Sequence, residues 1–99
     1  MSLTITTPIT TIEGFEVATS YGRVAVVDQI NGKYIDSQLT IFTNEQAFLD
    51  GKQQMNANLE CYTRNVYDRT VEGVDILDLA HNNLIDLLAK QGISATKNL

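Results

Sequence analysis

Two apolar-rich runs, YGRVAVVDQI at residues 21–30 and KYIDSQLTIF at residues 33–42, flank the dipeptide Asn31-Gly32. Asn-Gly between two such runs is typical of a type I′ turn, because both central residues of that turn need a positive φ. The stretch therefore predicts a β-hairpin over residues 21–42, and the other segments are interpreted by how they could pack on it.

A two-residue loop determines which side chains share a face, because side chains alternate along a strand. It would pair Val24 with Leu39 and Val26 with Ser37. One face is then the natural core side, with Val24, Val26, Ile30, Ile35, Leu39 and Ile41. The opposite face carries Tyr21, Ala25, Val27, Tyr34 and Phe42 beside Arg23, Asp36, Gln38 and Thr40. This second face is too apolar for free solvent, so we expect it to be covered as well.

The composition is that of one globular domain. The chain has 99 residues, of which 43% are hydrophobic and 19% charged, and this balance argues against disorder. The net charge of -5 disfavours nucleic acid as a partner, since the few basic residues form no cluster. Cys61 is the single cysteine, so no disulfide can form within the chain.

No stretch of the sequence predicts contact with a membrane. A membrane-spanning helix needs about 20 apolar residues, and no run approaches that length. The first twelve residues carry no basic side chain, so we do not expect them to act as a secretory signal peptide.

Further segments complete the predicted fold. They are an extended N-terminal arm over 1–12, a short helix over 44–50 with Thr43 as its N-cap, a strand over 58–67, a helix over 74–91 and a loose tail over 94–99. The fold class is therefore α+β: a small antiparallel sheet with the C-terminal helix packed on one face, in a single domain over 13–93.

The arm is uncharged and rich in threonine. Leu3 and Ile5 alternate with threonines, and Pro8 interrupts regular pairing before Ile9. Such a segment could pair with the sheet edge of a neighbouring subunit, or it could be a frayed terminus. The first interpretation makes Leu3, Ile5 and Ile9 candidate interaction residues.

Tyrosines on a half-covered sheet face also suit a protein interface, because each combines an apolar ring with a polar tip. The alternative is that they pack under the protein's own arm or helix. The remaining candidate interaction residues are Tyr21, Tyr34, Phe42 and Tyr62.

Few residues indicate catalytic or metal chemistry. Oxygen ligands line one face of the predicted C-terminal helix, at Asp75, Asp78, Asn82 and Asp86, but a solvated polar face explains them better than a Mg²⁺ or Ca²⁺ site. His81 is expected to be a hydrogen-bonded core histidine, and Cys61 to be a core side chain. Since no familiar catalytic motif occurs, we predict a protein that is not an enzyme and has no catalytic residue, metal or cofactor.

One resemblance covers about residues 14–52. GFEVATSYGRVAVV at 14–27, the Asn-Gly turn, LTIFTNEQAFLDGK at 39–52 and a closing leucine-rich helix resemble small accessory virion proteins of tailed bacteriophages. The resemblance implies a non-enzymatic tail, baseplate or capsid-associated component, located in the virion or the bacterial host cytoplasm. It implies homo-oligomers or virion neighbours as partners, and no functional residue is transferred from it.

Two other functions stay open at this point. The run from residue 72 to residue 86 carries four acids and no base, as an acidic inhibitor or decoy of a host nucleic-acid-binding protein would. A small ligand-binding or enzymatic domain would instead place a pocket between sheet and helix, around His81, Tyr62 and Asp86.

Overall fold

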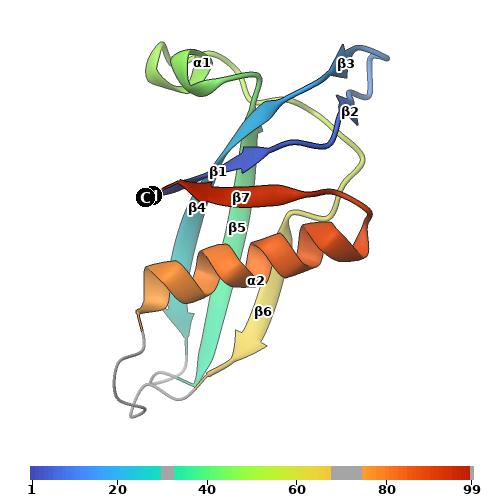
Figure 1. The fold of residues 1–99 in the computed structure, drawn as a ribbon. Helices are drawn as coiled ribbons and strands as arrows, with labels where there is room; N and C mark the ends of the chain where they lie inside the picture. The colour runs from blue at the N-terminus through green and yellow to red at the C-terminus, as the bar shows by residue number, and fades with distance from the viewer. Residues whose placement is uncertain (30–32, 68–74, 99) are drawn as a thin grey trace.

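A computed structural model describes residues 1–29, 33–67 and 75–98, and its architecture confirms the α+β class (Figure 1). In chain order the elements are β1 (Ser2–Ile5), β2 (Ile9–Thr10), β3 (Glu16–Val17), β4 (Ser20–Gln29), β5 (Tyr34–Phe42), α1 (Glu45–Leu49), β6 (Tyr62–Val66), α2 (Ile76–Lys90) and β7 (Ala95–Asn98). Five strands form one antiparallel sheet in the order β6-β5-β4-β1-β7, and β2 pairs with β3 beside it. α2 crosses one face of the sheet.

The predicted hairpin is present with the predicted register. Val24 pairs with Leu39 and Val26 pairs with Ser37, as a two-residue loop requires. Alternation then directs one set of side chains toward α2, and the buried members of that set on β5 are Ile35, Ser37, Leu39 and Ile41. Ile30 and the Asn31-Gly32 turn lie outside the described residues.

The N-terminal segment is an interior strand of the protein's own sheet, and this contradicts the predicted arm. β1 pairs with β4 on one side and with β7 on the other. Leu3 and Ile5 are 0% exposed and Ile9 is 3% exposed, in the same core cluster as Leu84 and Leu88 of α2. The three aliphatic side chains are therefore buried by this chain itself and are not available to a neighbouring subunit.

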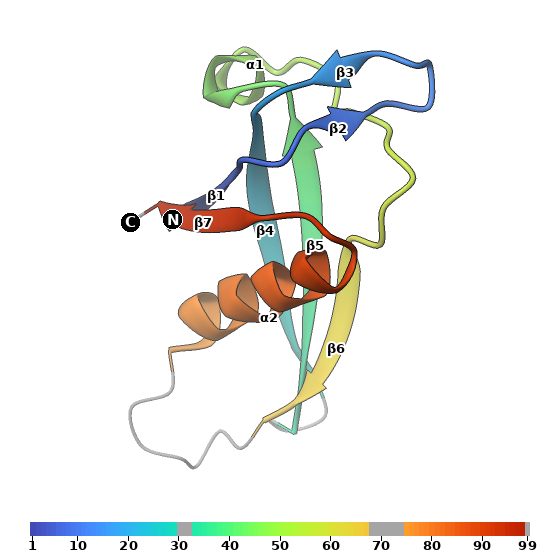
Figure 2. The same cartoon turned by 45° about the vertical axis from the view of Figure 1, so that its right-hand side comes forward.

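The C-terminal segment is also ordered, so the prediction of a loose tail is wrong for Ala95–Asn98. The chain leaves α2 through Gly92, whose φ of 79° suits glycine, and then runs back beside β1 (Figure 2). The side chain of Asn98 donates to the hydroxyl groups of Ser2 at 2.9 Å and Thr4 at 2.8 Å. The two ends of the chain therefore stabilise each other.

The helices start where side chains cap their free N–H groups. In α2, Asp75 accepts from the backbone N–H groups of Leu77 at 3.0 Å and Asp78 at 3.2 Å. In α1 the N-cap is Asn44, which accepts from Ala47 at 2.8 Å, so the prediction of Thr43 as the cap is off by one residue.

β6 is shorter than the strand predicted over 58–67. The regular pairing with β5 starts at Tyr62, so residues 58–61 of the predicted strand do not belong to β6. At Glu60 a side chain takes the place of a neighbouring strand. The side-chain amide of Gln91, at the end of α2, accepts from the backbone N–H of Glu60 and donates to the backbone C=O of Glu60.

The burial of β1 leads to a first prediction. We expect Leu3→Ala to lower the free energy of unfolding by about 2–5 kcal/mol, because it leaves a cavity in the core. Ile12→Ala is the matched control: Ile12 is 72% exposed, and its loss should change stability by less than about 0.5 kcal/mol. Urea denaturation of both variants measures the difference, and equal small losses would mean that residues 1–12 are a frayed end.

Candidate functional site

The face of the sheet opposite α2 is the candidate site. Alternation along β4, β5 and β6 brings to this face the side chains of Tyr21, Arg23, Val27, Tyr34, Asp36, Gln38, Phe42, Tyr62, Arg64 and Val66. Because β4, β5 and β6 are consecutive in the sheet, these side chains form rows across three strands. One row runs from Val27 through Asp36 to Arg64, and the next pairs Tyr34 with Val66.

One end of this face is covered by α1. Phe48 of α1 packs on two aromatic rings, with centroid distances of 5.9 Å to Tyr21 and 5.2 Å to Phe42. The guanidinium carbon of Arg23 lies 4.7 Å from the centroid of Phe48, which is a cation–π arrangement. Tyr21 and Phe42 therefore pack under the protein's own short helix, which is the alternative that the sequence left open for them.

The other end of the face is organised by the carboxylate of Asp36, which accepts hydrogen bonds from Arg64 and Tyr62. Arg64 donates to Asp36 from Nε at 2.7 Å and from Nη2 at 3.0 Å, and the hydroxyl group of Tyr62 donates to the same carboxylate at 3.0 Å. Asp36 is only 8% exposed as a result. The hydrogen bonds and negative charge of Asp36 raise the pKa of Arg64 above its ordinary value, so the guanidinium group keeps its proton.

Exposed apolar side chains surround this ion pair. Val66 is 80% exposed, Val27 is 52% exposed and Tyr62 is 50% exposed, while Tyr34 lies under the guanidinium group of Arg64. We call Val27, Tyr34, Tyr62, Arg64 and Val66 the open-face patch. Tyrosine and arginine are enriched in protein–protein contacts, where they lie beside apolar side chains.

The structure separates the seven predicted interaction residues into three groups. The core contains Leu3, Ile5 and Ile9, α1 covers Tyr21 and Phe42, and the open-face patch contains Tyr34 and Tyr62. Sequence reasoning missed Val27, Arg64 and Val66. Side-chain alternation along a strand over 58–67 puts Tyr62, Arg64 and Val66 on one side, but the pairing of that strand with β5 was not predictable from local sequence.

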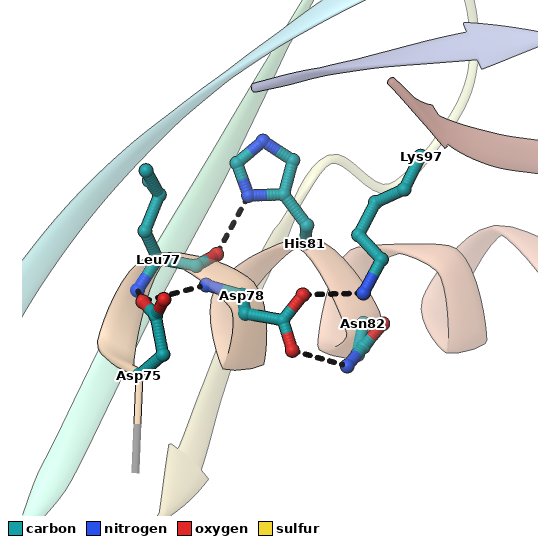
Figure 3. Close-up of polar contacts among 6 residues, drawn as sticks. All are labelled: Asp75, Leu77, Asp78, His81, Asn82 and Lys97. Atoms are coloured by element: carbon teal, nitrogen blue, oxygen red, sulfur yellow. Dashed lines mark hydrogen bonds and ion pairs between the residues drawn. The ribbon is translucent and has the colours of Figure 1, made fainter. Parts of the chain in front are cut away.

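His81 lies on the covered face of the sheet, on the side of α2 that points toward the strands (Figure 3). It is 0% exposed, and its Nδ1 lies 2.6 Å from the backbone oxygen of Leu77. Tyr62 is on the other face of the sheet, and Asp86 is exposed on α2. The structure therefore does not bring together His81, Tyr62 and Asp86, the three residues suggested for a ligand pocket.

The polar face of α2 is engaged in structural contacts (Figure 3). Asp75 caps the helix, and Asp78 forms an ion pair with Lys97 of β7. In the described part of the chain, no three His, Cys, Asp or Glu side chains are grouped as a metal site would require. Glu72, the first acid of the acidic run, lies outside the described residues.

Cys61 lies half-buried just before β6 and packs against the core cluster. Burial raises the pKa of its thiol, because a thiolate would lose solvation there. The reactive thiolate form is therefore disfavoured, and the side chain fills space.

A shallow cavity of about 600 Å³ lies between α1 and the ends of β1, β4 and β7. Hydroxyl and amide groups line it, and those of Ser2, Thr4 and Asn98 bond to one another. The bonds among Ser2, Thr4 and Asn98 stabilise the junction of β1 and β7.

Comparison with protein-family models, with curated proteins and with solved structures finds no match to this chain. Among the described residues, no helix has the length and apolar character needed to cross a bilayer. The open-face patch is therefore the feature of the molecule that indicates a function.

The Asp36–Arg64 pair leads to a second prediction. Asp36→Asn should lower the free energy of unfolding by about 1–3 kcal/mol, because charge-assisted hydrogen bonds to a buried carboxylate are lost. The double variant Asp36→Asn/Arg64→Gln should lose little more, since both substitutions remove the same contact. Urea denaturation of the two single variants and the double variant tests this coupling, with Gln38→Ala on the same face as the control. Strictly additive losses would contradict it.

Proposed function

We propose that this protein is a non-enzymatic structural or assembly protein that acts through self-association and protein–protein contacts, as a virion component of a tailed bacteriophage. The observation that carries the proposal is the open-face patch, in which an aromatic and two aliphatic side chains remain exposed around a neutralised ion pair. Grouped apolar side chains on a folded surface mark sites of protein contact.

The chemistry of the patch favours a protein as the partner. Arg64 is the cation of the patch and is paired with Asp36, so it offers no free positive charge for a phosphate group. The net charge of -5 points the same way. A partner surface with apolar side chains and few charges would bury Val66 and Val27 without separating the ion pair.

The virion role depends on the resemblance over residues 14–52. That stretch contains α1 and two strands of the open face: β4, which supplies Val27, and β5, which supplies Tyr34 and Asp36. A virion component acts in many copies beside its neighbours, and a sheet face available for contacts suits such a role.

A third prediction tests self-association. Size exclusion with light scattering should give a mass that rises above the 11.0 kDa of the monomer as protein concentration increases. Val66→Asp should weaken the association about tenfold or more, because a buried valine contributes roughly 1.5–3 kcal/mol. Leu49→Asp is the control, because Leu49 is 64% exposed on α1 outside the patch, and it should leave the association unchanged. A strict monomer at millimolar concentration would contradict the proposed function.

A further inference from the structure

The backbone of β6 has hydrogen-bonding groups that point away from the sheet. Cys61 accepts from Leu39 at 2.7 Å, and Tyr67 donates to Lys33 at 3.1 Å, so the odd-numbered residues bond toward β5. In an antiparallel ladder the intervening residues direct their N–H and C=O groups to the opposite side. Tyr62, Arg64 and Val66 therefore direct their backbone N–H and C=O groups outward. No described strand bonds to these outward groups.

The N-terminal end of this open edge is set by Gln91, which blocks the backbone of Glu60. Glu60 would be the next residue with outward backbone groups, but the amide side chain of Gln91 occupies both of them, at 2.8 Å and 3.0 Å. The free edge among the described residues thus consists of three positions, Tyr62, Arg64 and Val66.

The two end strands of the sheet differ in how they are protected. β7 contains Lys97, whose side chain points toward α2 and pairs with Asp78, and an inward-pointing charge is a known protection of sheet edges. β6 has no proline and no lysine, and its one charged side chain is neutralised by Asp36. β6 is therefore the edge suited to pairing.

We propose that the partner of this edge is a second copy of the chain, with the two β6 strands paired antiparallel about a two-fold axis at Arg64. In this register Tyr62 lies opposite Val66 of the partner subunit, and Arg64 lies opposite the partner's Arg64. The inference rests on the proposed function and specifies the surface that would carry self-association.

The outward backbone groups of Tyr62, Arg64 and Val66 favour this register over its neighbours. It forms three hydrogen-bonded pairs, each with two bonds, and every free position of the edge is used. A shift of two residues toward the N-terminus would place Val66 opposite the partner's Glu60, whose backbone is already bonded to Gln91. The chosen register also sets an aromatic ring beside a β-branched side chain, which is a favourable cross-strand pair.

The like charges at the axis do not oppose the pairing strongly. Each Arg64 donates two hydrogen bonds to Asp36 of its own chain, so the facing groups are ion pairs and not isolated cations. Exposed charges in water are further screened by solvent and salt.

Val66→Pro tests the hydrogen-bonded edge. Proline removes the outward N–H and is tolerated on an edge strand when that N–H faces solvent, so the variant should fold as the wild type does. We expect its self-association to weaken at least tenfold by light scattering, whereas Val66→Thr, which keeps the N–H and the β-branch, should self-associate within threefold of the wild type. Circular dichroism and thermal unfolding check the fold of both.

Cysteine pairs test the register, in a Cys61→Ala background. Hydrogen-bonded partners in an antiparallel pair have Cα atoms about 5.5 Å apart, which lies within the range that a disulfide spans. A mixture of the Tyr62→Cys and Val66→Cys chains should therefore form a disulfide-linked dimer on mild oxidation. Either chain alone should not, because like positions would be about 13 Å apart. Val27→Cys, on the same face but away from the edge, is the control.

The outcomes separate this inference from the proposed function. A wild-type dimer that persists in Val66→Pro, or that cross-links through Tyr62→Cys alone, overturns the β6 pairing and leaves self-association standing. A wild type that stays monomeric at millimolar concentration overturns both, and would direct the search to a strand from another protein. Loss of association in Val66→Pro together with cross-linking only in the mixture supports the pairing.

Discussion

The insertion of β1 between β4 and β7 is the contact on which the rest of the structure depends. It buries Leu3 and Ile5 completely and gives the C-terminal strand a partner. Without it, β4 would be an end strand and β7 would have nothing to pair with. β1 contacts residues more than ninety positions away in the sequence, as in the bond between Thr4 and Asn98. The five-stranded sheet is therefore complete only when β1 and β7 are both in place.

This arrangement also determines where the sheet remains open. The helix α2 takes one face, and its Gln91 occupies the backbone of Glu60 at the start of β6. The short helix α1 takes one end of the other face through Phe48. Among the described residues, the outer edge of β6 and the patch beside it stay uncovered, and there Asp36 holds Arg64 and Tyr62 in place. Edge and patch are continuous, so one partner could contact both.

The sequence predicted the parts of the fold that local pattern determines. The Asn-Gly dipeptide and strand alternation predicted the register of β4 with β5, and apolar residues at helical spacing predicted α2 to within two residues. The sequence predicted an extended segment around Leu3 and Ile5, but it did not predict β1 and β7 as strands of the sheet, since their pairing is non-local. For the same reason, alternation placed Tyr62, Arg64 and Val66 on one side of a strand, but only the pairing with β5 brings Arg64 to Asp36.

Amide hydrogen exchange of β6, measured by NMR at low and high protein concentration, tests the central claim most directly. The account predicts that the amides of Thr63 and Asn65, which bond toward β5, are protected at both concentrations. It predicts that the amides of Tyr62, Arg64 and Val66 exchange freely in dilute solution and at least tenfold more slowly at high concentration. Uniform protection along β6, or exchange of these three amides that does not change with concentration, would contradict an open edge that pairs with a second copy.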